Sequence, residues 1–364
     1  MLLELTDVRG AYKIVKSGDR VPAYVVSSES GREVLCDSMA VGRAFQRKIG
    51  SAVRHALRAL LEIDHAFAVE FSSAPPSVLN ILRGGLNFEA QDACEEVAGR
   101  PVAVSFMTSE RTVQDGHAVV SSDEYRRFDF SANSVLVVGD ISATGSTIVN
   151  ALRHILKSQP EPVRPRNVVV VTVGTVAALE TINKFCESIQ RSESKLADVK
   201  IRVVFLEGAF GLYHQRLALP EHLDGTDFIR AGGLVTPEFM LQSLRQPISL
   251  LERCVVYDGG VRGFSPRTHL VSLLKYWKES VVFSGDSIAV LQEHLEKKTG
   301  VDLFADSPPA VSAWRGLPGS SVQEVYTAAT DLKSVKMLMA IVDLSSNRAD
   351  DVGRQLVTLG KGDK

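Results

Sequence analysis

The sequence has few cysteines, no long apolar run and no recognisable leader. Its four cysteines, Cys36, Cys94, Cys186 and Cys254, lie far apart and form no CxxC pair. This spacing argues against a zinc or redox motif and favours reduced thiols in a cytoplasmic protein. The longest apolar runs, such as 168–173, have the length of a strand, whereas a membrane-spanning helix needs about 20 apolar residues. The first residues lack a basic segment followed by an apolar stretch, so we expect no secretory signal.

Charge of one sign is also missing. The 41 Lys and Arg residues and 43 Asp and Glu residues give a formal net charge of −2. Proteins that bind nucleic acid over a large surface usually carry a basic excess, so we expect no nucleic-acid partner. We also expect no membrane partner, and we expect a homodimer. The chain has 364 residues, 45% of them hydrophobic, enough for one large domain or two of ordinary size.

From about residue 66, short apolar runs alternate with amphipathic stretches of helical period. Such alternation is typical of a parallel sheet covered by helices on both faces. The sequence therefore predicts an α/β fold with a mostly parallel, doubly wound sheet of about five strands. The predicted strands are 78–82, 102–106, 135–138, 168–173 and 201–206, and the predicted helices are 88–98, 146–157 and 176–189.

The most informative segment is residues 134–147, which read as a buried strand, an acid, a Thr/Gly/Ser loop and the start of a helix. Backbone N–H groups at a helix N-terminus are unpaired and the helix dipole is positive there, so this position suits a phosphate. Gly145 allows a close approach of the backbone, and Thr144, Ser146 and Thr147 add hydroxyl donors. Asp140, at the carboxyl end of the strand, can accept hydrogen bonds from ribose hydroxyls.

This segment resembles the signature of type I phosphoribosyltransferases, which has four apolar residues, two acids, three variable residues and Thr-Gly-x-Thr/Ser. Here the positions are 135–138, Gly139-Asp140, 141–143 and 144–147, and the departure is Gly139, which replaces the first acid. The resemblance implies that residues Ala143, Thr144, Gly145, Ser146 and Thr147 bind the 5′-phosphate of phosphoribosyl pyrophosphate (PRPP). It also implies that Asp140 is catalytic, as the remaining ribose contact and a possible Mg²⁺ ligand. Since the family carries an acid at position 139, we expect Gly139→Asp to be tolerated.

Two further segments fit the same family. Arg83-Gly84-Gly85 follows a short apolar strand, and the run resembles the Ile-Leu-Arg-Ala-Gly-Leu pyrophosphate loop of uracil phosphoribosyltransferases. The resemblance implies that Arg83 is catalytic and that Gly84 and Gly85 expose amides to the pyrophosphate, although an ordinary structural turn is the alternative. The polar stretch 107–118 matches the family's mobile lid. Arg111 and His117 are its candidate anion contacts, and solvated loop charges are the alternative.

The resemblance implies an N-terminal hood segment (1–65) and a core with an acceptor-side segment (66–250). A second alternation of strand-like and helical stretches after about residue 250 predicts a smaller C-terminal α/β unit (251–364). Phe210, Tyr213 and Phe228 are candidates for stacking on a flat acceptor, with core packing as the alternative for each. In the C-terminal unit, a predicted strand at 254–257 is followed by Asp258. This order resembles haloacid-dehalogenase-like phosphatases, but Gly260 replaces their second aspartate, so the role of the unit stays open.

The function that these patterns predict is transfer of ribose 5-phosphate from Mg²⁺-bound PRPP to a base or another nitrogen nucleophile, with release of pyrophosphate. The alternative is a regulatory protein that senses PRPP or a nucleotide and has lost turnover. Gly139 favours this alternative, while Arg83 and the complete Thr-Gly-Ser-Thr loop favour the enzyme.

Overall fold

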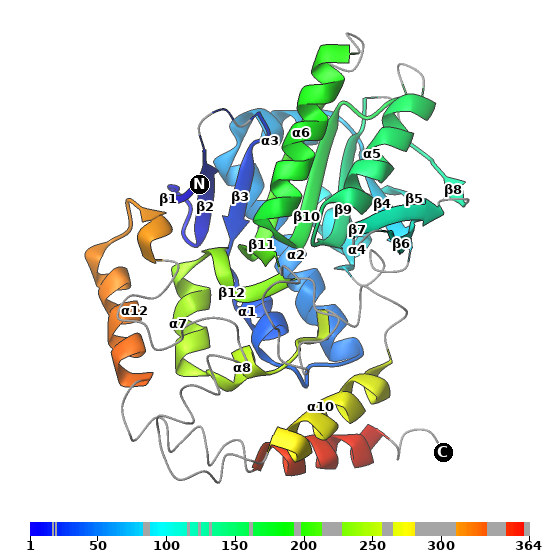
Figure 1. Cartoon of the computed structure of the whole chain (residues 1–364). Helices are drawn as coiled ribbons and strands as arrows, with labels where there is room; N and C mark the ends of the chain where they lie inside the picture. Colours follow the sequence, from blue (N-terminus) through cyan, green and yellow to red (C-terminus); the bar gives the residue numbers. More distant parts are fainter. Residues whose placement is uncertain are drawn as a thin grey trace.

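Five parallel strands form the centre of the molecule (Figure 1). They are β4 (Pro76–Leu82), β5 (Ala103–Thr108), β9 (Val135–Ser142), β10 (Asn167–Thr175) and β11 (Lys200–Leu212). Their order across the sheet is β11-β10-β9-β4-β5. Every residue of β10 is buried, as expected for a strand that has neighbours on both sides and helices on both faces. The predicted α/β fold and all five predicted strands are confirmed.

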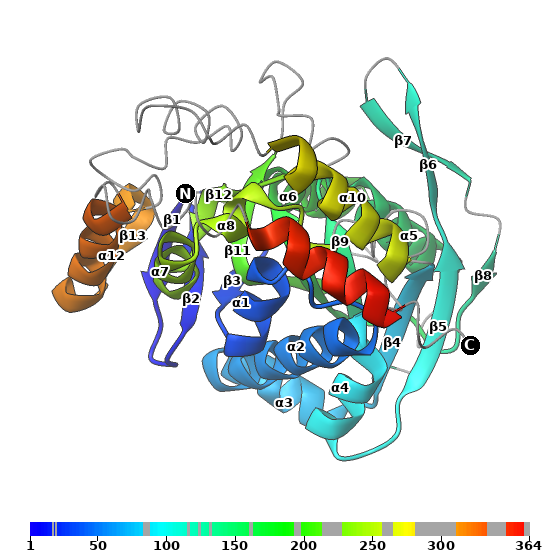
Figure 2. The same ribbon diagram turned by 90° about the horizontal axis from the view of Figure 1, so that it is seen from below.

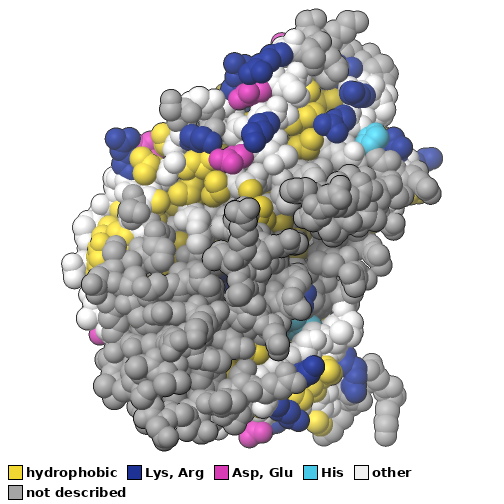
Figure 3. All heavy atoms as spheres, viewed as in Figure 1, with side chains coloured by type: hydrophobic (Ala, Val, Ile, Leu, Met, Phe, Trp, Pro, Cys, Tyr) yellow, Lys and Arg dark blue, Asp and Glu magenta, His cyan; other side chains and the backbone are white. Residues whose placement is uncertain are grey.

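The computed structural model describes residues 1–16, 18, 20–82, 88–114, 117–122, 125–130, 133–159, 163–192, 198–212, 228–256, 265–280, 311–332 and 347–359. Within these residues no helix is both long enough and apolar enough to cross a membrane. On the face drawn in Figure 3, Lys and Arg side chains are spread over the upper and lower parts and are interleaved with Asp and Glu.

The sheet is wider than the sequence predicts, because short strands extend both edges to give 11 strands. On the β11 side lie β3 (Ala23–Val26), β2 (Ala11–Val15), β1 (Leu2–Leu5) and β13 (Trp314–Arg315), and β12 (Phe228–Val235) folds back on β11. On the other side β8 (Arg126–Arg127) pairs with β5. Such strands are joined by backbone hydrogen bonds, which a pattern of two to five side chains does not reveal. A separate hairpin consists of β6 (Glu110–Gln114) and β7 (His117–Ser122).

Helices cover both faces of the sheet (Figures 1 and 2). One face carries α5 (Ser146–Ser158) and α6 (Val176–Ser192), whose apolar residues pack with Leu136 and Val138 of β9. The opposite face carries α1 (Glu29–Cys36), α2 (Arg43–Ile63), α3 (His65–Ser73) and α4 (Ala90–Ala98), which pack with Val135 and Val137. The first 65 residues therefore supply strands to the main sheet and helices that cover one of its faces. That these residues also form a hood over an acceptor stays a prediction.

The described C-terminal helices lie at the left and at the bottom of Figure 1, with α10 and the final helix lowest. They are α7 (Pro237–Arg245), α8 (Ile248–Leu251), α10 (Pro266–Ser280), α12 (Gly319–Leu332), the short 3-10 helix η5 (Val311–Ala313) and a final helix at 347–359. The buried Glu252 carboxylate, at the end of α8, connects α10 with the final helix, because it accepts hydrogen bonds from Trp277 Nε1 at 2.7 Å and Arg348 Nε at 2.6 Å.

The strand predicted at 254–257 is wrong in its described part, because residues 255–256 are helical. An apolar run of four residues has no periodicity that separates a strand from a helical turn. Asp258 and Gly260 lie outside the described residues. The boundary of a C-terminal unit at residue 250 stays a prediction.

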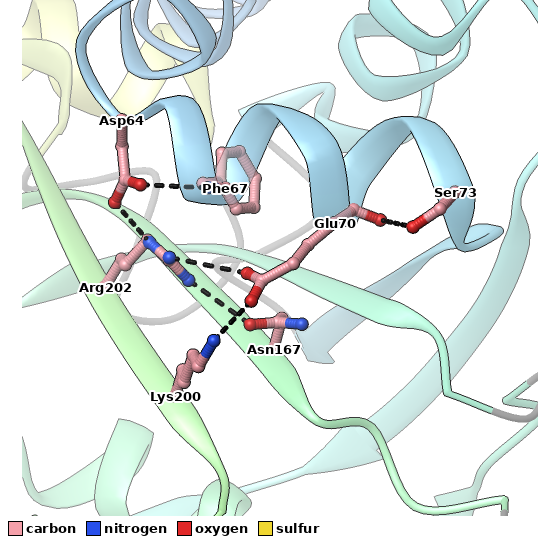
Figure 4. A network of polar contacts seen from close by, with 7 residues as sticks. All are labelled: Asp64, Phe67, Glu70, Ser73, Asn167, Lys200 and Arg202. Carbon is pink, nitrogen blue, oxygen red and sulfur yellow. Dashed lines mark hydrogen bonds and ion pairs between the residues drawn. The ribbon is translucent and has the colours of Figure 1, made fainter.

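A buried polar network holds α3 against the amino ends of β10 and β11 (Figure 4). Arg202, 4% exposed, donates through Nε to Asp64 Oδ2 at 2.7 Å, and its guanidinium lies 3.4 Å from Glu70 Oε2. Asp64 also caps α3 by accepting a hydrogen bond from the Phe67 amide at 2.9 Å. The Arg202 hydrogen bond lowers the pKa of Asp64 against the opposing effect of its burial. This network lies at the sheet edge opposite the Thr/Gly/Ser loop, so its role is structural.

Candidate functional site

The strand order creates a topological switch point between β4 and β9. The chain passes from β4 to its neighbour β5 on one side, and then returns to place β9 on the other side of β4. In open α/β sheets, ligands bind in the crevice outside the carboxyl ends of the strands at this point. The carboxyl end of β9 leads into the loop 143–145, which we call the phosphate loop, and that of β4 leads toward Arg83.

The phosphate loop has a conformation that requires glycine. Gly145 has φ of 79° and is the N-cap residue of α5. A β-carbon there would lie 2.9 Å from the Ala178 carbonyl oxygen and 3.1 Å from Thr181 Cβ. Both the left-handed backbone and the close contact with α6 therefore exclude a side chain.

The start of α6 holds the phosphate loop in place. Thr175, which is fully buried, donates its hydroxyl hydrogen to the Ala143 carbonyl and accepts a hydrogen bond from the Ala178 amide at 3.1 Å. The sequence analysis did not select Thr175, although a threonine between a buried strand and a helix is a recognisable N-cap signal. Its two hydrogen bonds join the Ala143 carbonyl to the first turn of α6.

The first turn of α5 has no side-chain cap, so its backbone amides lack a partner from the N-cap residue. Thr144, Ser146 and Thr147 beside it are partly exposed. The hydroxyl oxygens of Thr144 and Ser146 lie 3.0 Å apart and share a hydrogen bond. Free amides at a positive helix end, together with hydroxyl groups, make a site suited to a phosphate group. This arrangement agrees with the predicted phosphate-binding residues, whose role stays a prediction.

Asp140 lies near the carboxyl end of β9, opposite Thr172 of β10 in the strand register. Its side chain is 7% exposed. Because side chains alternate along a strand and Leu136 and Val138 face α5 and α6, Asp140 lies on that same face. The carboxylate is thus on the side of the sheet on which the phosphate loop continues into α5. Its contact with ribose stays a prediction.

Gly139 faces the opposite side of the sheet, where Phe88 occupies the space next to it. A β-carbon at Gly139 would lie 2.8 Å from Phe88 Cβ, 3.1 Å from Cγ and 3.3 Å from Cδ1. Phe88 is buried, with 1% of its surface exposed. The expectation that Gly139→Asp is tolerated is therefore wrong for this backbone, because the carboxylate and Phe88 compete for one space. Sequence reasoning missed Phe88, since nothing in the local pattern pairs it with Gly139.

Several predicted site residues cannot be placed. Arg83, Gly84, Gly85 and Tyr213 lie outside the described residues. Arg111 and His117 belong by their backbones to the β6–β7 hairpin, and Phe228 belongs to β12, but their side chains are not described.

Of the three predicted acceptor-stacking residues, only Phe210 has a described side chain. It is fully buried, and its ring centroid lies 5.6 Å from that of Phe239 in an edge-to-face contact. This environment favours core packing, the alternative that the sequence left open.

A second acid that the sequence analysis did not select is Glu207. It is fully buried in β11, with φ of 65°. Its carboxylate accepts hydrogen bonds from the Ser27 hydroxyl and the Ser28 amide, both at 2.6 Å. Burial raises the pKa of Glu207 to about 8, against the lowering effect of these hydrogen bonds and of Arg32. A buried acid with a left-handed backbone leaves no pattern in the sequence by which it could have been found.

Comparison with known proteins gives matches among solved structures only. No protein-family model matches the chain, and no curated protein matches it by sequence. Adenine phosphoribosyltransferase from Leishmania donovani is 15% identical, with 53% of this chain and 86% of that chain covered and a TM-score of 0.32. A hypoxanthine-guanine phosphoribosyltransferase from Bacillus anthracis is 16% identical, with 36% and 68% covered and a TM-score of 0.25. The AQ2163 protein from Aquifex aeolicus is 18% identical, with 50% and 87% covered and a TM-score of 0.33. At these values the activity has to be argued from the geometry of the site.

Proposed function

We propose that this chain is a phosphoribosyltransferase that uses Mg²⁺-bound PRPP to transfer ribose 5-phosphate to a base or another nitrogen nucleophile. The observation that carries the proposal is the phosphate loop at the switch point between β4 and β9. There the α5 N-terminus has no side-chain cap and Gly145 has a left-handed backbone. The Thr175 hydroxyl donates a hydrogen bond to the Ala143 carbonyl of the loop. A set of amides and hydroxyls at this edge supports binding of a sugar phosphate.

In this proposal, each group of residues acts on one part of PRPP. Residues 143–147 hold the 5′-phosphate, and Asp140 holds the ribose and stabilises the positive charge that develops on its ring. Arg83, with the amides of Gly84 and Gly85, neutralises the departing pyrophosphate. The bond from C1′ to the pyrophosphate oxygen breaks, its electron pair leaves with pyrophosphate, and the acceptor nitrogen forms the new bond to C1′. The protein contributes orientation and electrostatic stabilisation rather than a covalent intermediate.

Mg²⁺ belongs to the proposal as a companion of the substrate. When bound, it would neutralise charge on the pyrophosphate oxygens. Carboxylate oxygens are ligands that Mg²⁺ prefers, and it commonly uses one or two of them together with phosphate oxygens and waters. Asp140, the acid at the carboxyl end of β9, fits such a role. Within the described residues, no three His, Cys, Asp or Glu side chains are grouped so that they could hold a metal ion.

The second candidate function is a PRPP- or nucleotide-sensing protein without turnover. The contact between Phe88 and Gly139 favours it, because an aromatic ring stands where a second ribose-binding acid would need space. A sensor needs the phosphate loop but no second acid. The two candidates therefore share the binding site and differ in turnover.

The test is PRPP-dependent release of pyrophosphate, measured in the presence of Mg²⁺ against a panel of purines, pyrimidines and amines. The proposal expects release with one class of acceptor and its loss in Gly145→Ala, which disrupts the phosphate loop. PRPP binding without release of pyrophosphate in the presence of any tested acceptor supports the sensor. Absence of PRPP binding contradicts both candidates.

A further inference from the structure

A charged cavity of about 540 Å³ lies between α2 and α4, on the sheet face opposite α5 and α6. Its volume is within the range of about 300–1,000 Å³ that is typical of small-molecule sites. Side chains three, four or seven positions apart share one face of a helix, and each wall of the cavity is such a face. The charged lining residues are Arg43, Arg47 and Arg54 from α2, and Glu89, Asp92 and Glu96 from α4.

The two helices touch at Gly50, which forms the floor of the cavity. A β-carbon at Gly50 would lie 2.8 Å from Glu89 Cβ, so the glycine lets the first turn of α4 approach α2. Farther along both helices, Glu96 pairs with Arg54 and accepts a hydrogen bond from Arg58 at 2.9 Å. This cluster closes one end of the cavity. The helices therefore run in the same direction, and the first turns of α2 stand at the other end.

At that other end, the described arginine side chains form no ion pair with the carboxylates of the α4 wall. Arg43 and Arg47 are exposed, and among the described residues neither forms an ion pair or a side-chain hydrogen bond. On the α4 side of the cavity, burial and a hydrogen bond with Asp92 raise the pKa of Glu89. Two guanidinium groups and a carboxyl pair thus line one open cavity. A ligand with an anion at one end and hydroxyl donors at the other would satisfy both walls.

We propose that this cavity binds a phosphorylated polyhydroxyl compound, of the sugar-phosphate or nucleoside-phosphate class, as a ligand site distinct from the phosphate loop. Arg43 and Arg47 hold the phosphate, since two guanidinium forks one helical turn apart can each donate two hydrogen bonds to its oxygens. The amide of Gln46, which lies between them on the same wall, adds a donor. Glu89 and Asp92 accept hydrogen bonds from the hydroxyl groups. The site does not depend on the proposed activity, because the phosphate loop continues into α5 on the other face of the sheet.

The test is calorimetric titration with ribose 5-phosphate, and separately with inorganic phosphate, on the full chain. We expect the double variant Arg43→Ala/Arg47→Ala to lose one ribose 5-phosphate site, with affinity falling at least about tenfold through loss of charge-assisted hydrogen bonds. Lys48→Ala is the matched control, since it removes a cation of the same helix that pairs with Glu33 and does not line the cavity. Glu89→Gln/Asp92→Asn should weaken the binding of ribose 5-phosphate and leave the binding of inorganic phosphate unchanged, because only the sugar reaches that wall.

The wild-type protein should show two ribose 5-phosphate sites if the phosphate loop also binds. A single site that the double arginine variant loses supports the cavity and counts against the phosphate loop. A single site that this variant retains overturns the cavity, and so do two sites that are unchanged in it. The assignment to a polyhydroxyl ligand is overturned if the double arginine variant loses inorganic phosphate binding while Glu89→Gln/Asp92→Asn leaves the affinity for ribose 5-phosphate unchanged. Thermal unfolding of each variant shows whether it is folded, and because Arg43 and Arg47 are exposed we expect no change.

Discussion

The side chain of Phe88 packs against Gly139, so that a β-carbon at position 139 would lie 2.8 Å from Phe88 Cβ. The two residues come from opposite sides of the switch point, one from the segment that follows β4 and the other from β9. An aromatic side chain thus occupies the place in which the signature of type I phosphoribosyltransferases has its first acid. Three of the five predictions below concern residues around this point, namely Gly139, Gly145 and Asp140.

Gly139→Asp should destabilise the protein because the new side chain overlaps Phe88. Overpacking of a core typically costs about 1–3 kcal/mol, and burial of a carboxylate adds to it. The free energy of unfolding in urea measures this change. Phe88→Ala removes the ring contacts at 3.1 Å and 3.3 Å but keeps the β-carbon at 2.8 Å. Gly139→Asp should therefore cost less in the Phe88→Ala background than in the wild type, without becoming neutral. Wild-type stability of Gly139→Asp would show that Phe88 moves away at little cost.

Gly145→Ala should weaken binding of phosphate ligands and destabilise the fold. The substitution places a side chain at φ of 79° and 2.9 Å from the Ala178 carbonyl oxygen. Gly99→Ala is the matched control, because Gly99 has φ of 63° but no atom within 4 Å of its added β-carbon. Backbone strain of about 1 kcal/mol is common to both variants. The loss of ribose 5-phosphate affinity, measured by calorimetry, should occur only at position 145, and equal losses in both variants would contradict the assigned loop.

Asp140→Asn separates the two candidate functions. If Asp140 stabilises positive charge on the ribose ring, its neutral isostere should lower kcat by about 10²- to 10³-fold, as removal of one electrostatic contact typically does. In a sensor the same change weakens PRPP affinity while no turnover exists. Pyrophosphate release and PRPP affinity, measured on wild type and variant, distinguish these results. Unchanged affinity together with no turnover in either form would leave Asp140 a structural residue.

Glu207 should make stability depend on pH. Its pKa is raised in the folded state from 4.5 to about 8, so the folded protein keeps a proton that the unfolded chain releases. The stabilisation is complete at low pH, decreases as pH rises through the interval between these values, and is constant above it, with a maximal slope of about 1.4 kcal/mol per pH unit. The free energy of unfolding from about pH 5 to about pH 9 should lose this component in Glu207→Gln. Identical slopes in both proteins would show that Glu207 is ionised when folded.

Arg202→Ala should be among the most destabilising single changes in the chain. It leaves Asp64 and Glu70 without the buried guanidinium that contacts both, and removal of one partner of a buried ion pair typically costs about 3–5 kcal/mol. Lys200→Ala removes a 59% exposed partner of Glu70 and should cost less than about 1 kcal/mol. Urea unfolding of the two variants measures the contrast. Similar losses would mean that Arg202 contributes no more than a surface charge.

The five central strands could be predicted because each is a run of apolar residues bounded by polar or turn-forming ones. The loop between β9 and α5 could be predicted because its turn residues are consecutive, Thr144 to Thr147, while its role in phosphate binding stays a prediction. Phe88 and Glu207 could not be assigned, since they act through a residue that is distant in the sequence or through a backbone angle. Thr175 has a local N-cap signal, but its contact with the Ala143 carbonyl is not local. The acceptor side gave no decisive pattern, and Phe210, selected as an aromatic residue after the last predicted core strand, packs against Phe239.

The sequence by itself determined the α/β class, the parallel strands and the loop that joins β9 to α5, because hydrophobic period and turn chemistry act over neighbouring residues. Only the tertiary structure decided the order of the strands, and with it the switch point that brings the end of β4 beside that of β9. It also decided that Phe88 fills the space at Gly139 and that short strands widen the sheet. These features arise from contacts and backbone hydrogen bonds between distant segments. Their free energy depends on which surfaces meet when the chain packs, and no local pattern records it.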